Sequence, residues 1–313
     1  MFERAFLTAV SLLMAAFSQT AQAEDSPYQI KQLVDGVYYH QGVHDDATES
    51  NYGAIANVGF VIGERCIAVI DSGGSYKEGE RLREAISTVS DKPVCYVINT
   101  HVHPDHMFGN AAFLKEEPEF VGHEKLPAAM AAREEFFSKT FPERLGSAYE
   151  GVQFISPDTT VSIEESIELD LGNRTLLLTA YSTSHTDHDL TVYDQQTNTL
   201  WTGDLLFIDR IPALDGSING WIATSEQLAI LPVTNVIPGH GPAGKGEIWQ
   251  AGWQRQLTYL ITIRDQIREI ILDFGTIEDA TSTVGLDEKP HWLLFDDYHR
   301  RNVTAAFVEL EWE

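Results

Sequence analysis

The sequence predicts an α/β (α+β) fold, and three observations lead to this prediction. Short β-rich runs fill the first part of the chain, β-rich runs then alternate with helical patterns, and a long amphipathic helical pattern begins at position 247. Of the 313 residues, 43% are hydrophobic and 22% are charged, so the chain can bury a sizeable core. One large domain, or one domain with an extension, is the expected organisation.

The N-terminus has the three regions of an export signal in order. Arg4 precedes an apolar run from Ala5 to Phe17, and Ala21 to Ala23 form the small-x-small pattern that signal peptidase cleaves. The apolar run is too short for an ordinary transmembrane helix. We therefore predict a signal peptide at residues 1–23 and a soluble mature protein that begins near Glu24. In a Gram-negative bacterium this protein would be periplasmic.

The next part of the chain has the pattern of strands followed by a crossover. An Asp-Gly pair between apolar-rich stretches predicts a hairpin over residues 32–42, and further β-rich runs follow at 57–62 and 66–70. A helical spacing then leads into the buried strand "PVCYVINT" at 93–100. This second strand of the crossover carries the "THVHPDH" stretch at its C-terminal end, where ligand sites in α/β sheets usually lie.

The rest of the chain continues the alternation and ends in helices. A strand ending at His123 is followed by a helical stretch through Arg133, and the β pattern returns from Val152 to Leu200. From Glu247 to Phe274 apolar side chains share one helical face, and Gly275 supplies the stop. This face consists of Trp249, Trp253, Leu257, Leu260, Ile263, Ile267 and Ile270.

The stretch "INTHVHPDHMFGN" places His101, His103, Asp105 and His106 within six residues. Four titratable side chains so close together are costly to desolvate unless something binds them, and a metal ion is the obvious candidate.

Other residues of the types that bind metals follow other β-rich runs. His185 and His188 lie in "STSHTDHDL", Asp204 in "WTGDLLF" and His240 in "VIPGHGPAG". A lone histidine at such a position is usually structural or solvated, but together with the cluster these residues predict a metal centre.

Taken in order, these motifs resemble those of the metallo-β-lactamase superfamily. "THVHPDH" corresponds to the family's H-x-H-x-D-H, "DSGG" at Asp71 precedes it, and "SHTDHDL", "GDLLF" and "PGHG" follow. The resemblance implies an αββα sandwich, which consists of two mixed sheets between helical layers with metals at one edge. It also implies a domain at residues 24–245 and a helical extension at 246–313 packed on that domain.

The resemblance implies two groups of metal ligands. The first metal would be held by His101, His103 and His185, the second by Asp105, His106 and His240, with Asp204 bridging the two. His188 could compete with His185, but His185 precedes Thr186 as in the family pattern, so we interpret His188 as a neighbour of the ligands or a structural residue. Asp71 would orient a ligand histidine.

This ligand set implies hydrolysis. Two zinc ions would lower the pKa of a water molecule and make hydroxide available as the nucleophile, with Asp105 holding it or moving its proton. The bond cleaved would be an ester, thioester, amide or lactam. Histidine and carboxylate ligands also suit iron, so a persulfide dioxygenase-like oxidoreductase is the main alternative. A non-catalytic metal-binding partner of a dehydrogenase is the third.

A narrower resemblance lies outside the metal ligands. "DRIPALDGSINGWI" at 209–222 and the C-terminal stretch from Tyr298 to Glu313 resemble the SoxH-like, quinoprotein-associated zinc metallohydrolases. This subgroup implies a link to a periplasmic quinoprotein dehydrogenase system, but it supplies no substrate.

Charge and loops limit what the site can bind. The formal net charge of -26 argues against nucleic acid or an anionic membrane surface as a partner, which leaves a small-molecule substrate. Two loops are expected to wall the pocket, from Val43 to Asn51 and from Asp209 to Gly220. In the second loop, Arg210 and Ser217 would contact a substrate with a polar or anionic end beside an apolar body.

The two cysteines, Cys66 and Cys95, precede the ends of two strands that the fold would place side by side. Export would permit a disulfide, but adjacent buried strand cysteines are more often simply packed, and this is our expectation.

Overall fold

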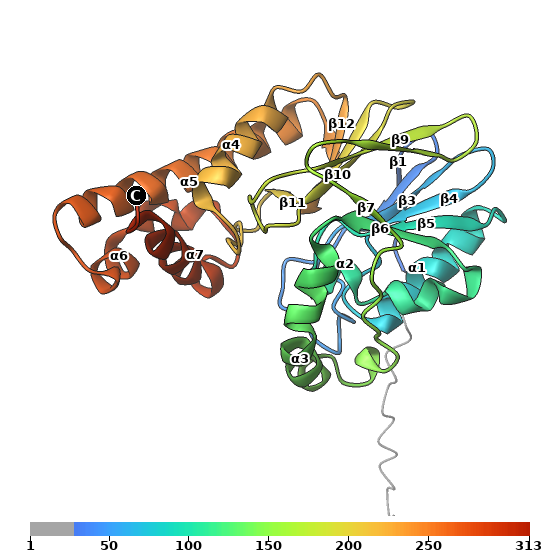
Figure 1. The fold of residues 1–313 in the computed structure, drawn as a ribbon, viewed down its shortest axis with the longest axis horizontal. Helices are drawn as coiled ribbons and strands as arrows, with labels where there is room; N and C mark the ends of the chain where they lie inside the picture. The colour runs from blue at the N-terminus through green and yellow to red at the C-terminus, as the bar shows by residue number, and fades with distance from the viewer. Residues whose placement is uncertain (1–27) are drawn as a thin grey trace, which may run out of the picture.

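The computed structural model describes residues 28–313, so the predicted signal peptide at 1–23 lies outside the described residues. The described chain forms two β-sheets packed face to face, with helices on the outer sides (Figure 1). This arrangement confirms the expected αββα sandwich. Among the described residues, no helix combines the length and the apolar character needed to cross a membrane.

The first sheet has seven strands that follow one another in sequence order. They are β1 (Lys31–Val34), β2 (Val37–His40), β3 (Val58–Ile62), β4 (Ile67–Ile70), β5 (Val94–Ile98), β6 (Glu119–His123) and β7 (Thr159–Val161). The pairs from β1 to β4 are antiparallel and those from β4 to β7 are parallel, so the sheet is mixed. Its helices are α1 (Tyr76–Val89), α2 (Pro104–Met107) and α3 (Leu126–Leu145), with 3-10 turns at Asn110–Glu116 and Gly146–Tyr149.

The second sheet has six strands in the order β13-β12-β11-β10-β9-β8. They are β8 (Ile167–Asp170), β9 (Thr175–Ala180), β10 (Leu190–Asp194), β11 (Thr199–Phe207), β12 (Asn235–His240) and β13 (Gly244–Lys245). Only β11 and β12 pair in parallel. The accompanying helices are α4 (Ile218–Ala229), α5 (Glu247–Leu272), α6 (Ile277–Thr283) and α7 (Phe295–Leu310), with a 3-10 turn at Leu286–His291.

Three apolar layers hold this arrangement together. Between the sheets, Val61 and Ile98 of the first sheet share a buried cluster with Leu178 and Val192 of the second. Outside the first sheet, Leu82 and Ile86 of α1 pack against its other face. Outside the second sheet, the largest cluster joins β11 to α4, α5 and α7. The central strands β3, β4, β11 and β12 are therefore covered on both faces and buried along almost their whole length.

Helix boundaries differ from the sequence prediction at two places. Helix α5 ends at Leu272, two residues before the predicted end, and Phe274 adopts a positive φ of 60°. The Gly275 N–H then donates to the Ile270 carbonyl at 2.8 Å, which closes the helix end. Helix α3 continues past Arg133 to Leu145, and because only Phe137 and Leu145 of this second half are buried, its sequence shows no clear apolar periodicity.

The expectation of free, packed cysteines is wrong, because Cys66 and Cys95 are joined by a disulfide. Cys66 directly precedes β4 and Cys95 lies in β5, and these strands pair side by side. Their Cα atoms are 5.8 Å apart, within the normal range for a disulfide. The bond therefore fixes the two strands that lead to Asp71 and to the histidine cluster.

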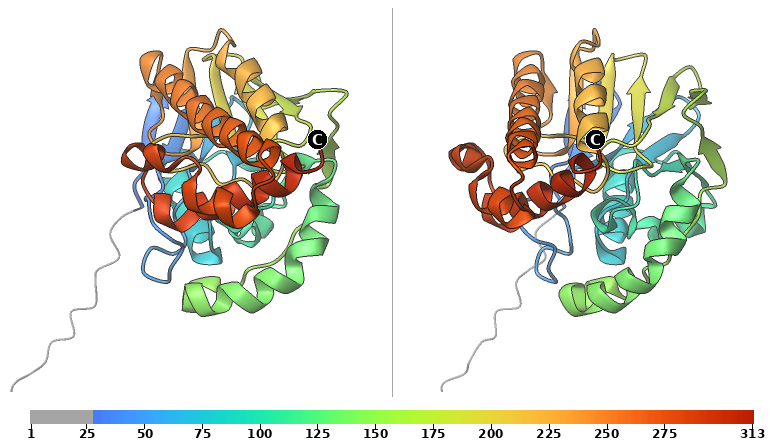
Figure 2. Two further views of the ribbon diagram at one scale, coloured as in Figure 1. Left: turned by 90° about the vertical axis from the view of Figure 1, so that its left-hand side faces the viewer. Right: turned by 60° about the vertical axis from the view of Figure 1, so that its left-hand side comes forward.

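The C-terminal helices pack on the second sheet and reach the edge where the histidines lie. Figures 1 and 2 show α7 and α3 at the same end of the sandwich, on different sides of it. Asn302 of α7 anchors the loop that follows β11: its amide donates to the Pro212 carbonyl at 2.6 Å and its oxygen accepts from the Leu214 N–H at 2.9 Å. The extension thus contributes directly to the surroundings of the site.

Candidate metal centre

The predicted ligands meet at one edge of the sandwich because each lies at or near a strand end. The loop after β5 and the short helix α2 carry His101 to His106, and the loop between β9 and β10 carries His185. Asp204 lies in β11 and His240 is the last residue of β12. Segments far apart in the sequence therefore present their polar side chains to a common point.

The ligand atoms form two groups, and within each group they lie within 4.8 Å of one another. One group contains His101, His103, His185 and Asp204, and the other contains Asp105, His106 and His240. Asp204 lies between them. Its Oδ2 is 3.5 Å from His185 Nε2 and 3.3 Å from His240 Nε2, and its Oδ1 is 3.1 Å from His106 Nε2.

Unpaired buried atoms indicate that these groups fit a cation. In the described part of the chain, His106 Nε2 and Asp204 Oδ1 are buried and lie 3.1 Å apart, but neither atom makes a hydrogen bond. Buried polar atoms without partners are costly, and a metal ion would satisfy both an imidazole nitrogen and a carboxylate oxygen. The donor set therefore fits two divalent cations.

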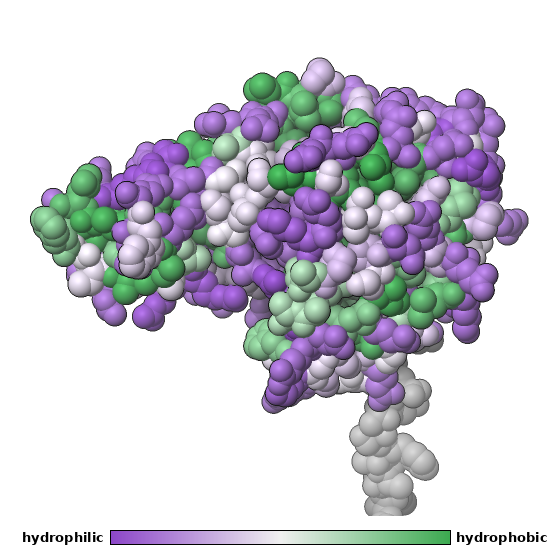
Figure 3. All heavy atoms as spheres, viewed as in Figure 1, coloured by the Kyte–Doolittle hydropathy of each residue, from purple (hydrophilic) through white to green (hydrophobic). Residues whose placement is uncertain are grey.

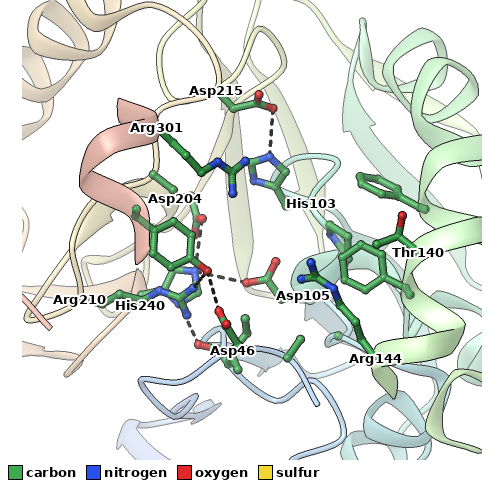
Figure 4. Close-up of a pocket in the computed structure, with 18 of the residues that line it drawn as sticks. Asp46, His103, Asp105, Thr140, Arg144, Asp204, Arg210, Asp215, His240 and Arg301 are labelled. Atoms are coloured by element: carbon green, nitrogen blue, oxygen red, sulfur yellow. Dashed lines mark hydrogen bonds and ion pairs between the residues drawn. The ribbon is translucent and has the colours of Figure 1, made fainter. Parts of the chain in front are cut away.

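Carboxylates and carbonyls behind the histidines fix their ring orientations. Asp71 Oδ2 is 2.8 Å from His106 Nδ1, and the Ile55 carbonyl is 2.8 Å from His240 Nδ1. Asp215 Oδ2 is 3.2 Å from His103 Nε2 (Figure 4). Each contact leaves the other ring nitrogen facing the site, as metal-binding histidines require.

Burial keeps part of the histidine set in the neutral form that binds metals. Burial lowers the pKa of His101 well below its ordinary value and lowers the pKa of His185 to about 3. His106 differs: burial lowers its pKa, but the carboxylates of Asp204 and Asp71 outweigh burial and raise it. Burial also raises the pKa of Asp105, but His106 and His240 outweigh burial and lower it, so this carboxyl group is ionised.

The structure places His188 outside both ligand groups. Its ring is buried, its Nδ1 lies 2.9 Å from the Thr186 hydroxyl, and its Nε2 is 3.6 Å from Asp187. His188 thus contacts residues of its own loop, which also presents His185.

Ser217, which was expected to contact a substrate, is not among the residues that line the cavity, and its side chain is engaged elsewhere. Its hydroxyl caps α4, accepting from the Gly220 N–H at 3.0 Å and donating to Glu309 at 2.8 Å. The segment interpreted as one loop enters this helix at Ile218, because Ser217 supplies a helix cap.

A cavity of about 320 Å³ opens onto the metal-binding groups. His103, Asp105, Asp204 and His240 lie at its base. The described surface is indented between the C-terminal helices and α3, and hydrophilic side chains gather there (Figure 3). From the early loop that was expected to wall the pocket, Asp46 and Ala47 line the cavity.

Arg210 is among the residues that line this cavity, but it is almost fully buried. Its guanidinium donates to the Tyr298 hydroxyl at 2.8 Å and to the Asp45 carbonyl at 3.4 Å. Arg210 therefore joins the early loop to α7.

Sequence reasoning missed several side chains of the site. Asp215, which contacts His103, stands in the second predicted loop but was not singled out. The cavity wall also contains residues of α3 and α7 that were not expected at the site, although the stretch 298–313 was noted for its resemblance to the SoxH-like subgroup. They are Arg133, Phe136, Phe137, Thr140, Phe141, Arg144, Tyr298, Arg301 and Asn302.

The family assignment follows from a match over more than half of the chain. The family model described as "Metallo-beta-lactamase superfamily" matches residues 52–240, which contain both groups of ligands. The chain belongs to the metallo-β-lactamase superfamily. Its fold and candidate metal groups are those of a metal-dependent hydrolase of this superfamily.

Individual relatives are distant. A linear primary-alkylsulfatase of Pseudomonas sp. is 35% identical over 51 residues, which are 16% of this chain and 10% of that protein. A metallo-beta-lactamase from Pontibacter korlensis has a similar structure, with a TM-score of 0.59 and 20% identity over 74% of this chain and 98% of that chain. The sec-alkylsulfatase Pisa1 from Pseudomonas sp. has a TM-score of 0.66 and 15% identity over 90% of this chain and 50% of that chain. The chain thus spans half of that alkylsulfatase structure, and these likenesses show the fold.

Proposed function

We propose that the protein is a binuclear zinc hydrolase that cleaves an ester, thioester, amide or lactam bond in a small molecule. The observation that carries the proposal is the position of Asp204, whose two carboxylate oxygens face histidines of both ligand groups. A carboxylate shared in this way is suited to bridge two cations. The cavity over the two groups gives a small substrate access to them.

In this proposal His101, His103 and His185 hold one ion, Asp105, His106 and His240 hold the other, and Asp204 joins them. Such ions would supply Lewis acidity and lower the pKa of water. Asp105 lies on the cavity side, with its Oδ2 3.4 Å from His240 Nε2. Its carboxylate can hold the attacking water and transfer a proton to the leaving group. Asp71 keeps the His106 ring in place, and Asp215 does the same for the His103 ring.

Export and a role beside a quinoprotein dehydrogenase belong to the same proposal. Export is supported by the three regions of the N-terminal sequence, and the quinoprotein system by the resemblance of 209–222 and of the C-terminal stretch to the SoxH-like subgroup. The disulfide between Cys66 and Cys95 agrees with an oxidising compartment.

Metal analysis and a substrate panel test the proposal together. Protein purified from the exported fraction is analysed for zinc and iron, then offered an ester, a thioester, a lactam, a persulfide and, because of the alkylsulfatase relatives, an alkyl sulfate. We expect two zinc ions per chain and hydrolysis that Asp204→Asn abolishes.

Two other outcomes would replace the proposal. Iron together with oxygen consumption on the persulfide would favour the dioxygenase-like alternative. Bound metal without turnover of any substrate, in protein that binds a quinoprotein dehydrogenase, would favour the non-catalytic partner.

A further inference from the structure

We propose that the substrate is an amphiphilic organic oxyanion, held by Arg301 of α7 and Arg144 of α3 on opposite walls of the cavity. The inference rests on the proposed function, since it names the substrate class of that site. It differs from the sequence-based expectation, which assigned substrate contact to Arg210 and Ser217.

The balance of positive and negative side chains in the cavity lining differs from that of the whole chain. Four arginines and four aspartates line it, whereas the chain as a whole has a formal charge of -26. The four aspartates are Asp46, Asp105, Asp204 and Asp215. With two divalent cations bound, the cavity would be strongly positive within a negative protein. Such a field concentrates anions at the site.

Every carboxylate of the lining is already engaged. Asp105 and Asp204 face the histidines, and Asp46 accepts from the Tyr298 hydroxyl at 3.2 Å. Asp215 contacts His103 and accepts from Arg133 at 3.1 Å. None of these contacts involves Arg301 or Arg144, so neither guanidinium is paired with a carboxylate of the lining.

Two of the four guanidinium groups remain available. Arg133 is paired with Asp215, and Arg210 is buried against Tyr298. Within residues 28–313, the guanidinium groups of Arg301 and Arg144 make no hydrogen bond or ion pair, although the Arg144 guanidinium lies 5.6 Å from the Phe141 ring centre. In Figure 4, Arg301 extends from α7 toward His103, and Arg144 extends from α3 toward Asp105.

Aromatic rings beside these arginines suit an apolar body. Phe136, Phe137 and Phe141 of α3 line the same wall as Arg144, and Phe207 lies deeper, stacked on His240 with ring centres 4.8 Å apart. Phe136 is 62% exposed although it belongs to the lining. Planar guanidinium groups bind carboxylate, sulfate or sulfonate oxygens in pairs, so the shared chemistry is an oxyanion attached to an apolar chain or ring.

Calorimetric titration with octanoate, octane-1-sulfonate and neutral octan-1-ol tests the inference without turnover. The full chain is titrated both after chelator treatment and after loading with zinc. We expect both anions to bind more tightly than octan-1-ol in both forms. Arg301→Gln and Arg144→Gln should each raise the Kd for the anions about tenfold, as expected for loss of one charge-assisted hydrogen bond.

Arg300→Gln is the matched control for Arg301, because it removes the same charge from the neighbouring exposed position of α7, outside the cavity lining. It should leave the Kd unchanged, and Arg301→Lys should recover part of the binding. Circular dichroism establishes that each variant is folded. A preference of octanoate over octane-1-sulfonate, or the reverse, identifies which oxyanion the arginines favour.

Anion affinities that are the same in wild type, Arg301→Gln and Arg144→Gln would overturn the inference, as would equal binding of octan-1-ol. If the protein hydrolyses a substrate but its Kd for the anions does not depend on Arg301 and Arg144, the inference is overturned and the proposed function stands. Arginine-dependent binding by a protein that takes up no metal and cleaves no substrate would count against the proposed function alone.

Discussion

The two sides of the cavity differ in how the sequence encodes them. On one side, His101, His103, Asp105 and His106 come from six consecutive positions, and the other ligands follow strands. On the other side, Tyr298, Arg301 and Asn302 come from a helix near the C-terminus that reaches the site by packing. The metal-binding side is a local pattern, whereas the substrate-facing side depends on tertiary structure. This difference suggests that the first side supplies the chemistry and the second selects the substrate.

Breaking the metal-binding side should have the largest effect. His103→Ala should empty the first metal position and His240→Ala should mainly weaken the second, because each removes one of three or four strong ligands. Hydrolysis should fall on the order of 10³-fold in each variant, since a catalytic metal contributes several kcal/mol. Metal content by mass spectrometry and steady-state rates measure the two effects.

His188→Asn and His185→Asn provide the control for these ligand variants. His188 lies outside the ligand groups, so His188→Asn should retain both metals, whereas His185→Asn should lose the first. The reverse result would exchange the roles of the two histidines. Unchanged metal content in His103→Ala and His240→Ala would contradict the assignment of both positions.

Breaking the substrate-facing side should reduce stability rather than metal content. Asn302→Ala removes the partners of the Leu214 N–H and the Pro212 carbonyl and leaves both without their bonds to α7. We expect the free energy of unfolding to fall by about 2–4 kcal/mol, because unsatisfied buried groups are costly. Urea denaturation of the zinc-loaded protein measures this change. Loss of zinc with unchanged stability would mean that α7 supports the metal-binding side instead.

The sequence predicted which residues cluster at the candidate metal centre, because close spacing leaves little freedom. Residues separated by one or two positions stay together whatever the rest of the chain does, so His101, His103 and His106 were found as a cluster. Their position at a strand end also followed from the pattern of the crossover. Strand interiors were found because every residue of β4 and β11 is buried and most of them are apolar.

The substrate-facing side could not be predicted in the same way. An exposed arginine on a helix, such as Arg301, has the sequence signature of a solvated side chain, and only the packing of α7 brings it to the cavity. Ser217 shows the converse: a polar residue in a predicted site loop serves as a helix cap. The disulfide was missed for a related reason, because neighbouring strands bring cysteines close without showing that their side chains meet.

A smaller effect on metal binding is expected from Asp71, which contacts a ligand histidine from behind. Asp71→Asn keeps a residue type that tolerates the positive φ of 53° at this position but removes the charge that faces His106. Metal affinity should fall roughly 10- to 100-fold, as is usual for partners of ligand histidines. Competition with a chromogenic chelator measures the affinity, and exposed Asp91→Asn is the control. An affinity equal to that of wild type would show that Asp71 does not orient His106.

The smallest effect is expected at Arg210, the residue that joins the two sides. Its guanidinium lines the cavity and contacts Tyr298 of α7, but it belongs to neither ligand group, so Arg210→Ala should leave the metals in place. We expect KM for the true substrate to rise about tenfold while kcat changes less than about threefold, because the buried guanidinium holds Tyr298 and the early loop in the cavity wall and so affects substrate binding more than the chemical step. Tyr298→Phe separates the two roles of the arginine, since it removes the hydroxyl that Arg210 contacts but keeps the ring. If KM is raised in Arg210→Ala but equals the wild-type value in Tyr298→Phe, the effect belongs to the guanidinium itself. A collapse of kcat with unchanged KM in Arg210→Ala would contradict the positioning role.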